Sequence, residues 1–263
     1  AKILIARGAP VNTKNERGAT PLHLASEKGA TALASLLLDS GADIASRDTS
    51  RRQPLHLAVQ GGHIALARLL IERGADVQFR EKRGYTPLHI ACERDDEPAA
   101  TLLIASGADL TVGDERGHTP LHVAAAVPAR KCFALLLSKG ADPNAGDKEG
   151  RTPLWPALEG DHLELAQALV NAGAKTSHVT PAGRTPMFPA VRGKSDKAAK
   201  WLVANGLTVD AVDKEGRTVL DEAAAYGEID TVRFLLAGGA PVNPLDAQGR
   251  LPLHLAAERG NVL

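Results

Sequence analysis

One four-residue motif recurs along this chain at a fixed spacing of 33 residues, and that spacing restricts the fold more than any other feature. The motif is Thr-Pro-Leu-His or a variant of it, and no insertion or deletion disturbs the series. A fixed period of about 20 to 50 residues is typical of repeat proteins, in which each unit packs on its neighbours. The motifs begin at residues 20, 53, 86, 119, 152, 185, 218 and 251.

Other residues follow the same period. A glycine lies two residues before each motif, except where Arg51 takes its place. An acidic or amide residue lies five residues before each motif, except at Thr180. Because glycine tolerates positive φ and Asp or Asn favours turns, this pair predicts a tight hairpin turn ahead of each motif.

The motif itself predicts the start of a helix. Thr is a good N-cap and Pro suits the first helical position. A second helix follows in each unit, carries leucine pairs such as Leu36-Leu37, and ends at a glycine such as Gly41. One unit alone exposes half of its apolar surface, so stacking of neighbours must bury it.

The combined pattern, D-x-x-G-x-TPLH-x-A followed by LL-x-x-GA-x-V-N, resembles the ankyrin repeat over the whole chain. The resemblance implies an all-α repeat solenoid of helix-turn-helix units with β-hairpin loops, arranged as a curved stack. We predict a single ankyrin-repeat domain over residues 1–263. The expected complete repeats are 15–47, 48–80, 81–113, 114–146, 147–179, 180–212 and 213–245, with partial repeats at 1–14 and 246–263.

Neither partial repeat has the polar surface of a natural terminal cap. We therefore expect this segment to be a fragment of a larger protein, flanked by more repeats or by another domain.

Composition restricts the class of binding partner and the cellular compartment. The net charge is zero, which argues against nucleic acid as the main partner. Cys92 and Cys132 fall among apolar helical residues, so packing is their expected role, and this usage suits a reducing compartment. We expect an intracellular protein, cytoplasmic or nuclear. No apolar run reaches membrane-spanning length, so we expect no membrane insertion.

The nine histidines do not indicate chemistry. Five of them are the fourth residue of the motif, where the resemblance implies a hydrogen bond to backbone that links neighbouring repeats. No catalytic or metal-binding motif occurs elsewhere. We expect no enzyme activity, no catalytic residue, no metal site and no cofactor.

Two adjacent repeats depart from the motif in the same way. Trp155-Pro156 and Phe188-Pro189 stand where other repeats carry His followed by an aliphatic residue. Either the two rings pack between repeats while the helix starts adjust, or they form an aromatic anchor for a partner. The sequence leaves both interpretations open.

The resemblance implies that hairpin tips and the inner-helix surface contact partners. At the variable hairpin positions, basic residues greatly outnumber acidic ones. The residue directly before the motif, here called the arginine position, is arginine in five repeats: Arg52, Arg151, Arg184, Arg217 and Arg250. Such residues repeat once per unit and should form a row along one edge.

We predict a protein–protein interaction scaffold or adaptor, monomeric in isolation, whose basic row binds an acidic or extended segment of another protein. The expected contacts are Arg52, Arg83, Tyr85, Arg94, Arg116, His118, Arg151, Arg184, Arg192, Arg217, Tyr226 and Arg250.

Three alternatives remain open at this point. The row can be a solvated charged face with the partner bound elsewhere. The basic edge can recognise a nucleotide or nucleic acid, with Tyr85 as a stacking residue. The chain can also be a regulatory arm of a larger enzyme or channel.

Overall fold

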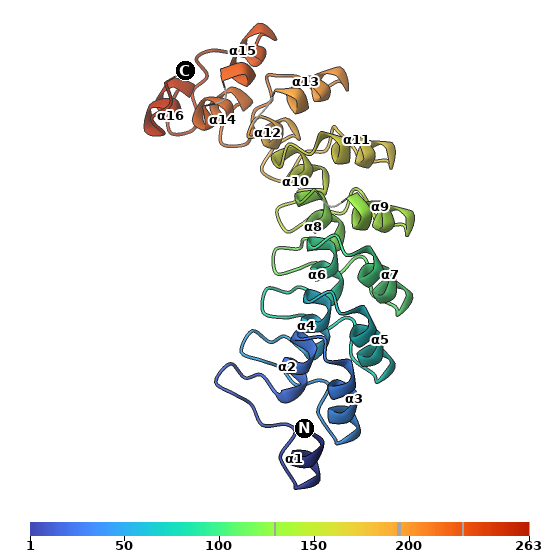
Figure 1. Cartoon of the computed structure of the whole chain (residues 1–263). Helices are drawn as coiled ribbons and strands as arrows, with labels where there is room; N and C mark the ends of the chain where they lie inside the picture. The colour runs from blue at the N-terminus through green and yellow to red at the C-terminus, as the bar shows by residue number, and fades with distance from the viewer. Residues whose placement is uncertain (129, 194–195, 228, 263) are drawn as a thin grey trace. The chain divides into compact units, whose positions relative to one another are not determined.

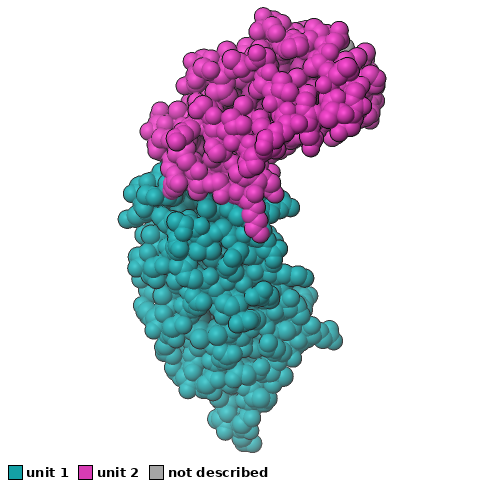
Figure 2. Space-filling view, turned by 180° about the vertical axis from the view of Figure 1, so that it is seen from behind, with its two compact units in different colours: residues 1–124, 129–141 teal, residues 125–128, 142–263 magenta. Residues whose placement is uncertain are grey.

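The computed structural model describes residues 1–128, 130–193, 196–227 and 229–262. Within these ranges the regular elements are helices, and the β pairing is an isolated antiparallel bridge between Val212 and Thr218. The predicted all-α repeat fold is confirmed. The chain divides into two compact units, unit 1 with residues 1–124 and 129–141, and unit 2 with residues 125–128 and 142–263 (Figure 2).

Each repeat contributes an inner helix, which starts at the motif, and an outer helix that follows it (Figure 1). The inner helices are α2 (Pro21–Glu27), α4 (Pro54–Gln60), α6 (Pro87–Glu93), α8 (Pro120–Ala126), α10 (Leu154–Glu159), α12 (Met187–Ala190), α14 (Val219–Tyr226) and α16 (Pro252–Glu258). The outer helices are α1 (Lys2–Ala6), α3 (Thr31–Asp39), α5 (Ile64–Glu72), α7 (Glu97–Ala105), α9 (Arg130–Ser138), α11 (Leu163–Asn171), α13 (Lys197–Ala204) and α15 (Ile229–Ala237).

Within each unit, successive repeats pack helix on helix. In unit 1, α2 packs on α4 and α4 on α6, while α3 packs on α5 and α5 on α7. In unit 2, α10, α12, α14 and α16 follow one another in the same way. The motif leucines and the alanines three residues later fill these contacts, as in the fully buried Leu55 and Ala58. Burial of small and aliphatic side chains between neighbours therefore supplies the core.

The hairpin ahead of each motif is closed in a common way. In the repeat 48–80, the Asp48 backbone N–H donates to the Arg52 carbonyl at 3.0 Å, and Asp48 Oδ1 accepts the N–H groups of Ser50 and Arg52. The glycine two residues before the motif adopts positive φ, for example 70° at Gly18. Arg51 holds the same conformation at φ 60° without being glycine, which is strained for a residue with a Cβ.

The two repeats with a second proline start their inner helices one residue later than the others. Helix α10 begins at Leu154 and α12 at Met187, each directly after the first proline. The Trp155 side chain is 6% exposed and that of Phe188 is 0% exposed. Both aromatic rings are therefore core residues with adjusted helix starts, and an anchor exposed to a partner is excluded.

Two motif histidines of unit 1 link neighbouring repeats, and a third bonds within its own repeat. His23 Nε2 donates to the Arg52 carbonyl, His56 Nε2 to that of Phe79, and His89 Nε2 to that of His118, at 3.0, 3.0 and 2.9 Å. These three imidazoles are buried. The expected link between repeats is confirmed for His23 and His89, whereas His56 bonds to backbone within its own repeat, 48–80.

Candidate functional site

Two consecutive hollows lie in unit 1 between the hairpins and the inner helices. The first, of about 470 Å³, lies between the repeats of α2 and α4, and the second, of about 270 Å³, between those of α4 and α6. Arg52 and Gln60 line both, so the two hollows adjoin each other across three repeats. We call this surface the unit 1 groove.

The groove has an apolar floor and a charged rim. Leu24, Leu57 and Ile90 supply the floor, one from each inner helix, and Leu24 is 46% exposed. The hairpin side of the rim is basic, whereas the inner helices contribute acids and an amide near their C-terminal ends. The hairpin residues are Arg17, Arg52, Lys82 and Arg83, and the helix residues are Glu27, Gln60 and Glu93.

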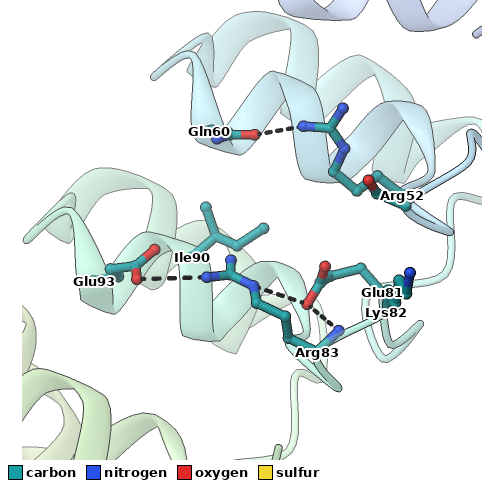
Figure 3. A pocket seen from close by; sticks show the side chains of 8 residues that line it. Arg52, Gln60, Glu81, Lys82, Arg83, Ile90 and Glu93 are labelled. Atoms are coloured by element: carbon teal, nitrogen blue, oxygen red, sulfur yellow. Dashed lines mark hydrogen bonds and ion pairs between the residues drawn. The ribbon is translucent and has the colours of Figure 1, made fainter. Parts of the chain in front are cut away.

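The predicted arginines of the groove are held by acceptors of their own repeats. Arg52 donates through Nε and Nη2 to Asp48 Oδ2 at 2.8 and 2.7 Å, and through Nη1 to Gln60 Oε1 at 3.3 Å. Figure 3 shows Arg83 between Glu81, at 3.4 Å, and Glu93, at 4.0 Å. These ion pairs orient the guanidinium groups and neutralise part of the positive charge.

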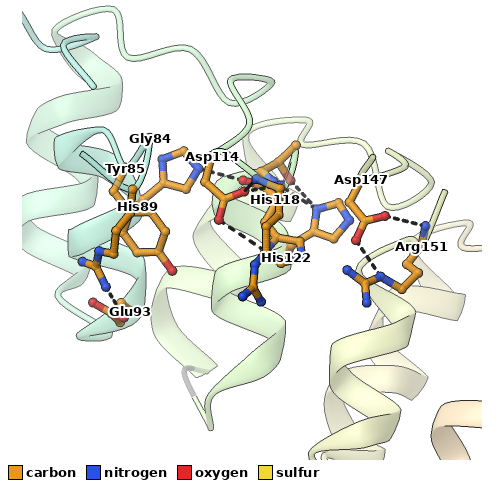
Figure 4. A network of polar contacts seen from close by, with 12 residues as sticks. Gly84, Tyr85, His89, Glu93, Asp114, His118, His122, Asp147 and Arg151 are labelled. Atoms are coloured by element: carbon orange, nitrogen blue, oxygen red, sulfur yellow. Dashed lines mark hydrogen bonds and ion pairs between the residues drawn. The ribbon is translucent and has the colours of Figure 1, made fainter. Parts of the chain in front are cut away.

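Of the remaining predicted residues of unit 1, Tyr85 and Arg94 lie on the third repeat of the groove, and Arg116 and His118 lie on the next repeat. The Tyr85 ring stacks on His89 with centroids 5.2 Å apart, and burial raises the pKa of its hydroxyl (Figure 4). His118 Nδ1 lies 3.3 Å from Asp114 Oδ2. Arg94 and Arg116 are exposed.

In unit 2, two residues at the arginine position repeat the arrangement of Arg52. Arg151 Nε donates to Asp147 at 2.8 Å and its Nη2 contacts Glu149 (Figure 4). Arg250 Nε donates to Asp246 at 2.9 Å, and its Nη1 lies 3.6 Å from Glu258.

Arg184 departs from this arrangement because its repeat carries Thr180 in place of the acid. Its Nε donates to Asp213 Oδ2 of the following repeat at 3.0 Å. Arg217, whose own acid is Asp213, is half-buried, and its Nε has no hydrogen-bond partner in the described structure.

Arg192 connects three repeats of unit 2. It donates to Glu159 at 3.1 Å and to Glu222, and its guanidinium lies 5.5 Å from the Tyr226 ring centroid. Glu222 is only 3% exposed and stands where Leu57 and Ile90 stand in unit 1. The ion pair therefore compensates a buried carboxylate. Tyr226, 43% exposed, remains accessible beside it.

Sequence reasoning identified the basic side of the groove and missed its acceptors. Glu27, Gln60 and Glu93 lie seven residues after the first residue of their motifs. Their periodic spacing was the available signal. Their pairing with hairpin arginines could not be read from that spacing.

The described residues show no cluster of His, Cys, Asp or Glu suited to a metal ion. No helix in the described ranges is long and apolar enough to cross a membrane. Cys92 and Cys132 are free and buried, and their mutual hydrogen bond together with burial raises the pKa of the Cys92 thiol. Both cysteines thus have the expected packing role.

Comparison with known families agrees with the repeat geometry. The family model described as ankyrin repeats in three copies matches residues 1–81, 77–147, 129–213 and 190–263. The chain belongs to the ankyrin repeat family. Ankyrin repeats generally act as protein–protein interaction modules and are generally non-enzymatic.

Among solved structures, the human ASB11 ankyrin repeat domain is similar to this chain. The two are 27% identical with a TM-score of 0.73, and the match covers 85% of this chain and 99% of the other. A search of curated protein sequences found no match.

Proposed function

We propose that this ankyrin repeat chain is a non-catalytic adaptor that binds an extended segment of another protein in the unit 1 groove. The observation that carries the proposal is the pair of hollows that share Arg52 and Gln60. Two adjoining hollows over three repeats suit a linear ligand better than a compact small molecule.

The size and chemistry of the groove define the segment. Packed helices lie about 8 to 10 Å apart, so three repeats span roughly 20 Å. An extended chain advances about 3.3 Å per residue, so about six residues cover the groove. An apolar side chain would contact the floor, and acidic side chains would face Lys82 and Arg83 through charge-assisted hydrogen bonds.

The paired state of the groove arginines favours selectivity over raw affinity. An incoming carboxylate must compete with Asp48, Glu81 or Glu93 for the same guanidinium groups. A poorly matched segment therefore loses existing ion pairs without replacing them. We further propose that the chain acts as a monomer inside the cell, which its two free, buried thiols support.

Affinity capture from cell extract tests the proposal, with identification of captured proteins by mass spectrometry. The variant K82E/R83E reverses two exposed charges of the groove, and R68E places the same kind of change on outer helix α5. We expect the parent and R68E to retain a common partner that K82E/R83E loses, with unchanged circular dichroism for all three. Retention of that partner by K82E/R83E would show that binding occurs elsewhere.

A further inference from the structure

Unlike the other residues at the arginine position, Arg217 forms no ion pair with an acid of the described structure. Arg52, Arg151 and Arg250 each form an ion pair with the acid four residues earlier, at 2.7 to 2.9 Å. Among the described residues, Arg217 forms no such pair, and its Nε is a buried donor without a partner. An unsatisfied buried donor is costly, so it requires a physical explanation.

The explanation begins one repeat earlier, at Thr180. Thr180 Oγ1 accepts the Arg184 backbone N–H at 3.1 Å and so maintains the hairpin turn, but it offers no charge to the Arg184 side chain. Arg184 therefore pairs with Asp213 of the next repeat. Asp213 Oδ1 still accepts the Arg217 backbone N–H at 3.0 Å, while the carboxylate oxygen that the Arg217 guanidinium would use is occupied.

A second acceptor is missing as well. Arg52 reaches Gln60 and Arg250 reaches Glu258, both seven residues after the first motif residue. Ala225 holds this position in the repeat of Arg217. Asp221 of the same repeat uses Oδ2 to accept from Thr218 N and Oγ1, and no ion pair to Arg217 is present among the described residues.

We propose that Arg217 is the acid-binding residue of unit 2, and that it pairs with a carboxylate on an extended segment of a protein partner. The assignment rests on the proposed function as a protein-binding module and deepens it. Arg52, Arg151 and Arg250 must break an ion pair to bind an external acid, whereas Arg217 has the charge of Asp221 nearby in the described structure and gains its first ion pair. A guanidinium–carboxylate pair can be bidentate, which specifies the geometry of the incoming acid.

The exposed ring of Tyr226 lies on the same repeat as Arg217 and supports a ligand with an apolar or aromatic side chain. Tyr226 follows Ala225 directly and is accessible, and the guanidinium groups of Arg192 and Arg259 lie 5.5 and 5.6 Å from its ring centroid. Arg192 is already paired with Glu159 and Glu222, so Arg259 supplies the cation beside this exposed ring at the end of α14. An acidic side chain flanked by an apolar or aromatic one fits this surface.

The pairing scheme also supplies a test that leaves Arg217 in place. In T180D the new acid would pair with Arg184, as in the repeats of Arg52 and Arg151. Asp213 would then become available to Arg217, which would lose its advantage for an external acid. T180N keeps a turn-forming acceptor without charge, as Asn15 does in its own repeat, and is the matched control.

The experiment uses a random-peptide library displayed on phage and panned on the whole chain. One panning contains excess soluble R217Q chain, so that only peptides that require Arg217 are retained. We expect these peptides to be rich in Asp or Glu, and to lose roughly tenfold or more in affinity on R217Q and T180D. Their affinity for T180N and for R250Q should stay within about threefold of the parent value.

Two failures are distinguishable. If no peptide survives the competitor while the panning without competitor still yields binders that K82E/R83E loses, the assignment of Arg217 is wrong and the proposed function stands. Surviving peptides that bind T180D as well as the parent would equally overturn the pairing argument. If neither panning yields a binder, recognition of extended segments fails, and the role of Arg217 fails with it.

Discussion

Acid should destabilise unit 1 through its motif histidines, and His89 allows the size of the effect to be worked out. His89 Nδ1 accepts the Thr86 backbone N–H at 3.2 Å, and Nε2 donates to the His118 carbonyl at 2.9 Å. The neutral imidazole therefore satisfies both contacts. A proton on Nδ1 would place two donors against each other.

Burial lowers the pKa of His89 from 6.5 to about 4 in the folded chain. Between those two pH values the unfolded chain binds a proton that the folded chain does not. The contribution of His89 to the free energy of unfolding is therefore fully present above about pH 6.5 and decreases as the pH falls toward 4. A shift of one pKa unit corresponds to about 1.4 kcal/mol, so His89 alone accounts for a loss of about 3 kcal/mol over this window.

The assay is equilibrium urea unfolding followed by far-UV circular dichroism at a series of pH values. The free energy of unfolding of the parent should decrease steadily through the window. H89Q removes the titrating group and should flatten the decrease by about 1.4 kcal/mol per pH unit, although it is less stable at neutral pH. H254Q changes the motif histidine of the last repeat, which is exposed, and is the matched control for the loss of stability at neutral pH.

Parallel curves for H89Q and the parent would refute the reasoning. They would mean that protonation of His89 is not linked to unfolding, and that the buried contacts to Thr86 and His118 do not hold the neutral form.

Three further outcomes follow from single sites. R51G should raise the free energy of unfolding by about 1 kcal/mol, because glycine adopts the left-handed conformation at φ 60° without strain; a lower melting temperature would contradict this. Burial raises the pKa of Asp221, so ionisation of this carboxyl disfavours the folded chain as the pH rises through the raised value. D221N should therefore be more stable than the parent at neutral pH. In chemical unfolding, the difference between their free energies of unfolding should narrow toward about pH 4. R192M should cost about 3 kcal/mol because Glu222 stays buried without a counter-charge, and R192M/E222L should recover most of that loss in urea titrations; additive losses would argue against the pair.

The repeat architecture could be predicted almost completely from the sequence. Hairpin turns, helix starts and helix ends are set by residues within a few positions of each other, and the period of 33 residues repeats these local signals in register. The structure therefore confirms the turns and helix starts that the local pattern predicts, as at Gly18, Asp48 and Thr86-Pro87. The structural role of the motif histidines was implied by the resemblance to the ankyrin repeat, because their contacts to the next repeat are not local.

The sequence predicted the row of arginines, but it did not show which acids pair with them. A spacing pattern shows that arginines recur and does not show which acid each guanidinium reaches. Arg184 and Arg217 have the same position and both lie between a glycine and a threonine, yet only Arg184 forms an ion pair in the described structure. The specific contact residues remain predictions.

The sequence alone thus determined the fold family, the register of the repeats and the face on which variable residues gather. Tertiary structure decided that Trp155 and Phe188 are core, that Glu222 needs Arg192, and that Arg184 takes the acid of Arg217. Turns and caps depend on contacts along the chain, whereas burial and ion pairing depend on distances between repeats that a one-dimensional pattern does not contain.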